Sequence, residues 1–239
     1  GCGVAKLLVK RQAKIGLLIS GDELVPAGSR RPPGAIWESN GTLLEAMLRS
    51  LGQTVTERRV VADQPAALSQ ALQSLAAQCD VVVSTGGVSA GDSDWIRPLV
   101  AELGEVAFWK LFLRPGRPFA FGRIGDDIPF FGLPGNPVAA AITALQLLWP
   151  ALQRLEGQTT LEVFPRLQVV LANRLARRPG RPELARAKLE TSDDGMLMAR
   201  IDGSQASSRI GSLQQADLLL EYQEDLLHLE HNPIPRLHP

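Results

Sequence analysis

The fold of this chain is decided by the stretch Val81-Val82-Val83-Ser84-Thr85-Gly86-Gly87-Val88-Ser89-Ala90-Gly91-Asp92-Ser93-Asp94. Its first three residues are β-branched and apolar, which is typical of a strand that is covered on both faces. The residues from Trp95 to Leu103 then place apolar side chains at the spacing of one helix face. The stretch therefore predicts a buried strand, a polar turn and a helix, which together form the repeating unit of an α/β fold.

The turn of this stretch has the composition of a ligand-binding loop. Its adjacent glycines, Gly86 and Gly87, let backbone N–H groups approach an anion without a Cβ atom in the way, and the following helix adds the positive end of its dipole. The alternative is a surface turn in which Asp92 caps the helix. The predicted ligand contacts in this turn are Ser84, Thr85, Gly86, Gly87, Ser89, Gly91 and Asp92.

Strands and helices also alternate before this stretch. Strands are predicted at 14–19 and 54–61, and helices at 39–51 and 65–77. Such alternation favours a parallel sheet with right-handed crossovers and helices on both faces. We therefore expect function at the carboxyl ends of the strands.

Beyond the stretch, strands are predicted at 106–113, 119–124 and 128–131, and a helix at 138–152. Glycine and proline gather in two loops here, as is typical of loops that hold a ligand on a rigid scaffold. The predicted contacts from these loops are Pro115, Gly116, Arg117, Pro134, Gly135 and Asn136. We predict a lead-in at 1–13, an α/β domain at 14–157, and a small all-β domain at 158–239, where short strands alternate with turns.

Composition narrows the functional class. The formal net charge is zero, so there is no electrostatic case for nucleic acid or an anionic membrane as a partner. Two cysteines are too few for a disulfide framework or a zinc site, which favours a reducing compartment. No apolar signal segment opens the sequence, and the helix at 138–152 is predicted to be too short to cross a bilayer. We expect a cytoplasmic protein.

Charged residues follow several predicted strands. Glu23, Asp63, Asp92 and Asp94 each come just after a strand, and such hard oxygen ligands suit Mg²⁺ at a phosphate or oxyanion. For any one of these carboxylates, the alternative is an ordinary solvated loop residue. Cations at Lys110, Arg114 and Arg117 could hold a tetrahedral oxyanion or could simply occupy a solvated edge. The four tryptophans, Trp37, Trp95, Trp109 and Trp149, are interpreted as core or interface residues.

These motifs resemble, in order, those of the MoeA family, the molybdopterin molybdenumtransferases related to the gephyrin E domain. The matching segments are Ser20 to Leu24, Glu38 to Asn40, Asp63, Ser84 to Asp94, Lys110 to Pro118, and Gly132 to Pro137. The resemblance implies a three-layer α/β/α molybdopterin-binding domain followed by a small β-barrel. It also implies that the two N-terminal domains of the family lie outside this sequence.

The activity that the resemblance implies is insertion of molybdate into adenylylated molybdopterin with Mg²⁺, giving molybdenum cofactor and AMP. The residues important for activity would be Glu23, Asp63, Asp94, Lys110 and Arg114, with Asp63 and Asp94 holding the metal. Arg186 and Ser207 would contribute to binding from the barrel. Implied partners are a second copy in a homodimer of the full-length protein, a MogA-like adenylyltransferase and acceptor molybdoenzymes.

The chain also departs from the family pattern. Arg114 and Arg117 stand where the family has lysines, and Gln205 to Ser208 replace a glycine-containing barrel loop. The tail from Leu229 is expected to lack the last barrel strand. Two other functions stay open: a molybdopterin-binding module or scaffold without turnover, and a nucleotide-cleaving hydrolase on the same fold.

Overall fold

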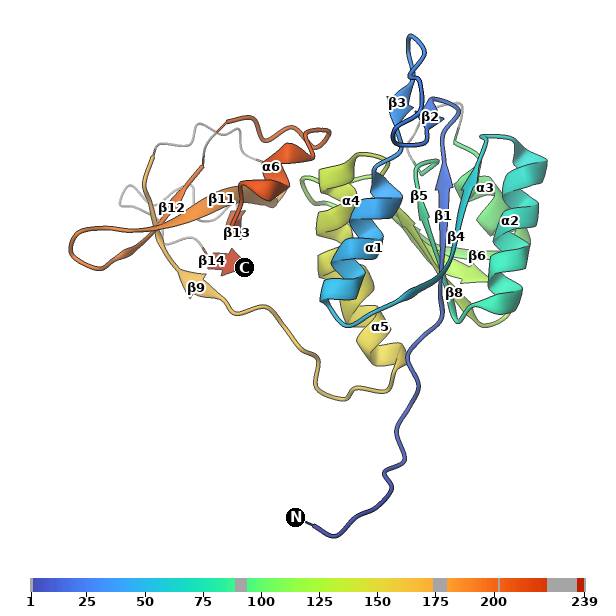
Figure 1. The fold of residues 1–239 in the computed structure, drawn as a ribbon, viewed down its shortest axis with the longest axis horizontal. Helices are drawn as coiled ribbons and strands as arrows, with labels where there is room; N and C mark the ends of the chain where they lie inside the picture. Colours follow the sequence, from blue (N-terminus) through green and yellow to red (C-terminus); the bar gives the residue numbers. More distant parts are fainter. Residues whose placement is uncertain (1, 89–93, 174–179, 202, 223–235, 239) are drawn as a thin grey trace.

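The computed structural model describes residues 2–88, 94–173, 180–201, 203–222 and 236–238. The first domain contains a six-stranded sheet in the order β4-β1-β5-β8-β7-β6 (Figure 1). Its strands are β1 (Ile15–Ser20), β4 (Val55–Val61), β5 (Val81–Thr85), β6 (Gly104–Trp109), β7 (Ala120–Ile124) and β8 (Ile128–Leu133). Its helices are α1 (Asn40–Ser50), α2 (Pro65–Gln78), α3 (Ile96–Leu103), α4 (Pro137–Thr143), the π-helical turn η1 (Ala144–Leu148) and α5 (Trp149–Leu155).

Helices cover both faces of the sheet because alternate residues of the buried strands point in opposite directions (Figure 1). Leu17 and Ile19 of β1 belong to the core cluster that includes Leu44 of α1 and residues of α4 and α5. Leu18, between them, belongs to the opposite cluster with Leu72 of α2 and residues of α3. The predicted three-layer α/β/α arrangement is therefore confirmed.

The sheet is parallel where strands and helices alternate, as expected, and antiparallel at one edge. β4, β1, β5 and β8 are parallel, but β7 pairs antiparallel with both β8 and β6. The turn at 125–127 is too short for a crossover, so it can only join antiparallel strands. Strand β6 also ends at Trp109 rather than near residue 113, because Lys110 has a φ of 72° in the left-handed region.

The helix predicted at 138–152 is longer than expected. Residues Pro137–Leu155 form a helix of 19 residues with a mean hydropathy of 1.2, which by length and composition is enough to cross a membrane. However, 61% of its most apolar window is buried inside the structure, where Ala140, Leu148 and Leu152 pack in the sheet core. These contacts are those of a core helix of the α/β domain.

The second domain is a small curled sheet in the order β10-β12-β11-β13-β14-β9. Its elements are β9 (Leu167–Gln168), β10 (Val170–Leu171), β11 (Glu183–Thr191), β12 (Leu197–Arg200), α6 (Gly211–Gln214), β13 (Leu218–Tyr222) and β14 (Arg236–His238). β9 and β10 are neighbours in the chain but lie at opposite ends of the strand order, so the sheet closes on itself as the barrel prediction requires. Strand β14 corrects the expectation that the tail lacks a final strand, since it pairs with β13 and β9.

The two domains are in direct contact. Val138 and Ile142 of α4 pack against Leu184 and Leu219 of the second domain. Backbone bonds add to this contact, because Leu184 N donates to the carbonyl oxygen of Arg114 at 2.9 Å and Val138 N donates to that of Ser207 at 3.1 Å. The start of α4 therefore lies beside the 205–208 loop of the second domain.

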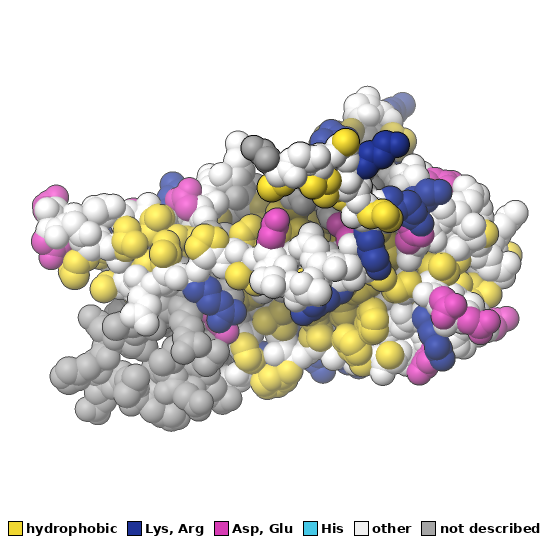
Figure 2. Space-filling model, turned by 90° about the horizontal axis from the view of Figure 1, so that it is seen from below, with side chains coloured by type: hydrophobic (Ala, Val, Ile, Leu, Met, Phe, Trp, Pro, Cys, Tyr) yellow, Lys and Arg dark blue, Asp and Glu magenta, His cyan; other side chains and the backbone are white. Residues whose placement is uncertain are grey.

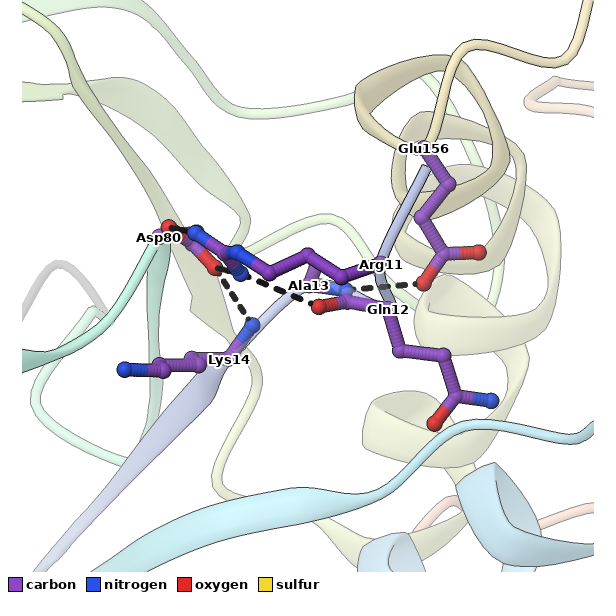
Figure 3. A network of polar contacts seen from close by, with 6 residues as sticks. All are labelled: Arg11, Gln12, Ala13, Lys14, Asp80 and Glu156. Atoms are coloured by element: carbon purple, nitrogen blue, oxygen red, sulfur yellow. Dashed lines mark hydrogen bonds and ion pairs between the residues drawn. The ribbon is translucent and has the colours of Figure 1, made fainter. Parts of the chain in front are cut away.

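The lead-in is tied to the amino end of the sheet by polar contacts (Figure 3). The Arg11 guanidinium forms a bidentate ion pair with Asp80, whose Oδ2 also accepts a bond from Lys14 N at 2.7 Å. Ala13 N donates to Glu156 Oε1 at 2.9 Å. These contacts join the residues before β1 to the end of α2 and the end of α5, on the side of the sheet opposite the strands' carboxyl ends.

Acidic and basic side chains are mixed on the face shown in Figure 2, where Lys and Arg lie in small groups among Asp and Glu with apolar surface between them. The mixture agrees with the zero net charge of the sequence. On this face, the described residues do not form an extended basic surface of the kind that nucleic-acid binding requires.

Candidate functional site

A cavity of about 720 Å³ lies at the carboxyl ends of the strands, the edge predicted for function. Its walls come from the loops after β1, β5 and β8, from the 113–118 loop, and from the 205–208 loop of the second domain. Among the predicted site residues, those lining the cavity are Glu23, Asp63, Thr85, Gly86, Gly87, Arg114, Pro115, Gly116, Arg117, Pro134, Gly135, Asn136 and Ser207.

The paired glycines are required by the backbone of their loop. Gly86 has φ +91° and Gly87 has φ +64°, a region that side chains disfavour. A Cβ atom at Gly86 would lie 2.6 Å from the carbonyl oxygen of Ser20, and one at Gly87 would lie 2.6 Å from Cγ1 of Ile96. Only glycine therefore fits this close approach, and the backbone of both residues faces the cavity without a side chain.

Asn40 joins three loops of the cavity. This role of Asn40 was not predicted from the sequence. Its Nδ2 donates to Thr85 Oγ1 at 2.9 Å and to the carbonyl oxygen of Gly135 at 2.7 Å. Thr85 Oγ1 in turn donates to the carbonyl oxygen of Pro134 at 3.1 Å. The only sequence signal was its place in the Glu38-Ser39-Asn40 motif. The network fixes the glycine turn relative to the loop after β8.

Glu38 fixes the start of α1 below the cavity. Its side chain is buried, accepts a bond from Gly41 N at 2.7 Å, and forms an ion pair with Arg58 of β4. The carboxylate therefore satisfies a free N–H group at the helix N-terminus, while its charge is compensated by the guanidinium. As a result, Asn40, the first residue of α1, is held in position.

Arginines supply the positive charge of the cavity. Arg114 and Arg117, from the loop before β7, both line it. Arg114 Nε lies 3.5 Å from Glu183 Oε2, which links this loop to β11 of the second domain. Arg181, just before β11, is a third lining cation that the sequence did not single out, because it follows a turn in the other domain.

Two carboxyl groups near the glycine turn have raised pKa values. Burial, followed by the nearby charges of Asp22 and Glu23, raises the pKa of Asp63. Burial also raises the pKa of Asp94 to about 7, with Arg97 opposing the effect and Asp63 adding to it. Charge repulsion from Asp63 thus contributes to the raised pKa of Asp94, and a cation bound near both groups would relieve it.

Asp63 and Asp94 fit a bound Mg²⁺ ion. Both carboxylate oxygens of Asp94 are buried and lack a hydrogen-bond partner among the described residues, so they are free to coordinate a cation. Within the described ranges, no group of three or more His, Cys, Asp or Glu side chains could hold a metal alone. Mg²⁺ commonly uses one or two carboxylates and completes its shell with water and ligand phosphate oxygens.

Other predicted site residues lie behind the cavity wall or outside the described residues. Ser84 is buried in β5, and Asp94 lies beyond the lining. Lys110 does not line the cavity either, because its Nζ lies 3.7 Å from the centroid of the Trp109 ring. Ser89, Gly91 and Asp92 lie outside the residues that the structure describes.

Arg186 is buried behind the 205–208 loop and is not part of the lining. Its backbone N donates to Gln205 Oε1 at 2.9 Å, and its guanidinium Nη2 donates to the carbonyl oxygen of Ala206 at 3.4 Å. Burial lowers the pKa of this guanidinium. The structure therefore places Arg186 where it supports the loop that carries Ser207.

The tryptophans do not share one environment. Trp149 is buried and packs against Phe164 with ring centroids 4.8 Å apart and the rings tilted by 41°, as the core interpretation expects. Trp109 lies under the guanidinium carbon of Arg97 at 4.4 Å. Trp37 is not a core residue, because this side chain is 53% exposed and lines the cavity, so only the interface interpretation stays open for it.

Two family models match the chain. The model described as "Probable molybdopterin binding domain" matches residues 16–154, and the model described as "MoeA C-terminal region (domain IV)" matches residues 168–231. The chain belongs to the MoeA family. The first match covers the MoeA-type α/β domain with the glycine turn, and the second covers most of the β domain that closes the cavity.

Named relatives agree with the MoeA assignment. A molybdopterin molybdenumtransferase of Haemophilus influenzae is 30% identical over 223 residues, which cover 93% of this chain and 55% of that protein. The molybdenum cofactor synthesis protein cinnamon of Drosophila melanogaster is 32% identical over 222 residues, covering 91% of this chain and 36% of that protein. The MoeA crystal structure from Pyrococcus horikosii has a TM-score of 0.75 and 26% identity, covering 95% of this chain and 53% of that one. The chain thus spans about half the length, or less, of these relatives.

Proposed function

We propose that this chain forms the substrate-binding part of a molybdopterin molybdotransferase, which inserts molybdate into adenylylated molybdopterin and releases AMP. One observation carries the proposal: a single cavity is lined by a side-chain-free glycine turn, a set of arginines and Asp63, whose carboxyl group has a raised pKa, and Asp94, whose pKa is raised in part by Asp63, lies behind this wall. These are the groups needed to bind a phosphate ester, an oxyanion and Mg²⁺, respectively. The names of the relatives support the same chemistry.

Each group has a defined task in this proposal. The backbone of Gly86 and Gly87 approaches a phosphate oxygen, and Asn40 keeps that turn in place. Arg114 and Arg117 bind molybdate, which is a substrate with tetrahedral oxygens and is matched by planar guanidinium donors.

Asp63 and Asp94 would hold Mg²⁺, which when bound neutralises charge on the phosphate that is cleaved. Their raised pKa values describe the metal-free pair, and a bound cation would favour the ionised form of both. Glu23 lies in the same wall and adds negative charge near the pair. Arg181 and Ser207 close the cavity from the second domain.

The proposal also concerns the cellular setting. We propose that the protein acts in the cytoplasm and that the full-length form is a homodimer. Its substrate would come from a MogA-like adenylyltransferase, because an adenylylated pterin has to be made before it can be cleaved. The product would pass to acceptor molybdoenzymes.

The test is to incubate the protein with adenylylated molybdopterin, molybdate and Mg²⁺ and to follow AMP release together with ligand binding. Arg117→Gln should lower molybdate-dependent AMP release. Arg123→Gln is the matched control, because Arg123 lies on β7 outside the cavity and pairs with Glu105 at 2.9 Å. Tight binding without AMP release would instead indicate a binding module or scaffold. Cleavage of nucleotides without a pterin would indicate a hydrolase.

A further inference from the structure

Trp37 lies on a small ribbon beside the cavity whose role the proposed chemistry does not explain. The ribbon consists of β2 (Leu24–Val25), β3 (Ile36–Trp37) and the loop between them, and it projects above the carboxyl edge of the main sheet (Figure 1). Large apolar side chains are normally buried, but Trp37 is 53% exposed while it lines the cavity. An exposed indole in a cavity wall is a surface that a ligand can cover.

The backbone around Trp37 is held firmly. Ile36 N donates to the carbonyl oxygen of Glu23 and Glu38 N donates to that of Val25, both at 2.8 Å. Trp37 Nε1 donates to the carbonyl oxygen of Ser29 at 3.4 Å. The backbone bonds place Trp37 beside the cavity, and the one hydrogen bond of the indole favours a single orientation of the ring before a ligand arrives.

A guanidinium accompanies the ring. The Cζ atom of Arg31 lies over the Trp37 ring at 5.4 Å from the centroid, and Arg31 Nη1 donates to the carbonyl oxygen of Ala35 at 3.0 Å. With a planar cation over one face, the indole keeps its other face for a ligand, and such arginine–aromatic pairs are used by proteins to stack nucleobases and other planar heterocycles.

The position of Trp37 relative to the glycine turn suits a ligand with a ring and a phosphate. Trp37 is separated by only Ser39 and Glu38 from Asn40, which bonds to the glycine turn through Thr85. Three residue steps span at most about 11 Å. Trp37, Gly86 and Gly87 also line the same cavity, so one molecule that carries a heterocycle and a phosphate ester can contact both places.

We propose that Trp37, together with Arg31, is a stacking platform for the planar heterocycle of the ligand whose phosphate binds at the glycine turn. This inference rests on the proposed function for the identity of the cavity's ligand class. An adenylylated pterin offers two planar rings, the pterin and the adenine. Both rings have a flat π-face and hydrogen-bonding groups along their edges. Trp37 is thus a binding and specificity residue for whichever of the two rings reaches the ribbon.

Binding of three probes tests the proposal: AMP, a pterin monophosphate, and ribose 5-phosphate, which has a phosphate but no heterocycle. We expect Trp37→Ala to weaken binding of the probe whose ring stacks by roughly 5- to 100-fold, as for loss of one base–aromatic stack. Trp37→Phe should retain most of the affinity, and ribose 5-phosphate should bind all variants equally. The probe that is affected identifies the stacked ring. Quenching of tryptophan fluorescence by that probe should disappear in Trp37→Phe.

Matched variants separate stacking from general effects. Arg31→Gln should weaken the same probe, whereas Arg30→Gln, at the exposed neighbouring position, should not. Phe112→Ala is the control for an exposed aromatic residue, because Phe112 is 70% exposed and does not line the cavity. Melting curves of all variants establish that each remains folded.

Three results would overturn the proposal. Equal affinity of wild-type protein and folded Trp37→Ala for both ring-bearing probes would show that Trp37 stacks neither ring, while the proposed function would stand. Unchanged binding with an altered oligomeric state in sedimentation would show that Trp37 contacts a second protein surface instead. If wild-type protein binds neither ring-bearing probe, the proposed function itself fails, and the inference fails with it.

Discussion

Replacing Asp94 with asparagine should stabilise the α/β domain above pH 7 and change its stability little at pH 4. Burial is the main cause that raises the pKa of Asp94 from its ordinary 3.8 to about 7. The folded protein therefore favours the protonated carboxyl group. The free energy of unfolding falls as the pH rises from 3.8, and the loss is complete above about pH 7. Asparagine has no charge to desolvate, so Asp94→Asn avoids this loss.

The size of the effect follows from the two pKa values. A tenfold difference in proton affinity corresponds to about 1.4 kcal/mol, so the full difference would be about 4 kcal/mol. Asp94 is partly exposed as a residue although its carboxylate oxygens are buried, and solvent screening reduces the expected effect to roughly 2 kcal/mol. In a chain of this size, such a change moves Tm by roughly 4 to 8 °C.

Thermal unfolding followed by circular dichroism between pH 4 and pH 8, with and without Mg²⁺, measures this effect. Without metal, Asp94→Asn should have the higher Tm at pH 8 and nearly the wild-type Tm at pH 4. Mg²⁺ should raise Tm of the wild type at pH 8 and that of the variant much less, because a ligand stabilises the state that binds it. Glu102→Gln, at an exposed position of α3, is the control for loss of a charge on that helix.

The reasoning would be refuted by a Tm difference that does not depend on pH. That result would mean that the Asp94 carboxyl group titrates as in the unfolded chain, so that its environment does not resist ionisation. An equal response of both proteins to Mg²⁺ would separately remove Asp94 from the metal site.

Three further perturbations follow from the contacts described above. Gly86→Ala should lower the free energy of unfolding by roughly 1 to 3 kcal/mol in denaturant titrations, because the added Cβ would meet a carbonyl oxygen at 2.6 Å and the φ of this residue is +91°. Gly135→Ala is the control and should fold normally, because the atom nearest to its Cβ would be 3.5 Å away. Equal stability of the two variants would contradict this reasoning. Asn40→Ala removes two hydrogen bonds, so it should reduce the free energy of unfolding by about 1 to 3 kcal/mol and weaken phosphate binding. An unchanged affinity for phosphate in calorimetric titration would show that the loops hold their positions without the Asn40 side chain. Arg11→Ala should lower Tm slightly at neutral pH, because the hydrogen bond from Arg11 lowers the pKa of Asp80 from 3.8 to about 2. The difference in Tm between wild type and variant should vanish as the pH falls toward 2 and Asp80 becomes protonated. A difference that persists below pH 2 would exclude this ion pair as its cause.

Much of the fold is predictable from local pattern. The apolar runs of β1 and β5 and the periodic helix α2 appear within a residue or two of their expected bounds, because each is specified by its own residues. The antiparallel direction of β7 is harder to predict from the sequence, because it depends on interpreting the short turn at 125–127 as the turn of a β-hairpin. The β2–β3 ribbon was missed because two-residue strands carry no periodicity.

The candidate site shows the same limit more strongly. The glycine turn could be predicted because its composition alone indicates close backbone approach. The bonds of Asn40 could not, because they depend on three loops meeting in space. Lys110 was expected at the site from its charge, but its left-handed backbone conformation accompanies a side chain placed over Trp109. Arg186 likewise carries the expected charge but is buried behind the loop.

Because the cavity has walls from both domains, a ligand that fills it can bind fully only when both are folded. Without a ligand, the domains are joined by a small apolar cluster around Val138 and Leu184 and by a few backbone bonds. With so small a contact, we expect each domain to unfold in its own transition. Binding adds one shared free energy to both halves of the chain. We therefore expect a ligand that fills the cavity to couple the unfolding of the two domains, so that calorimetry would record one transition with the enthalpy of both.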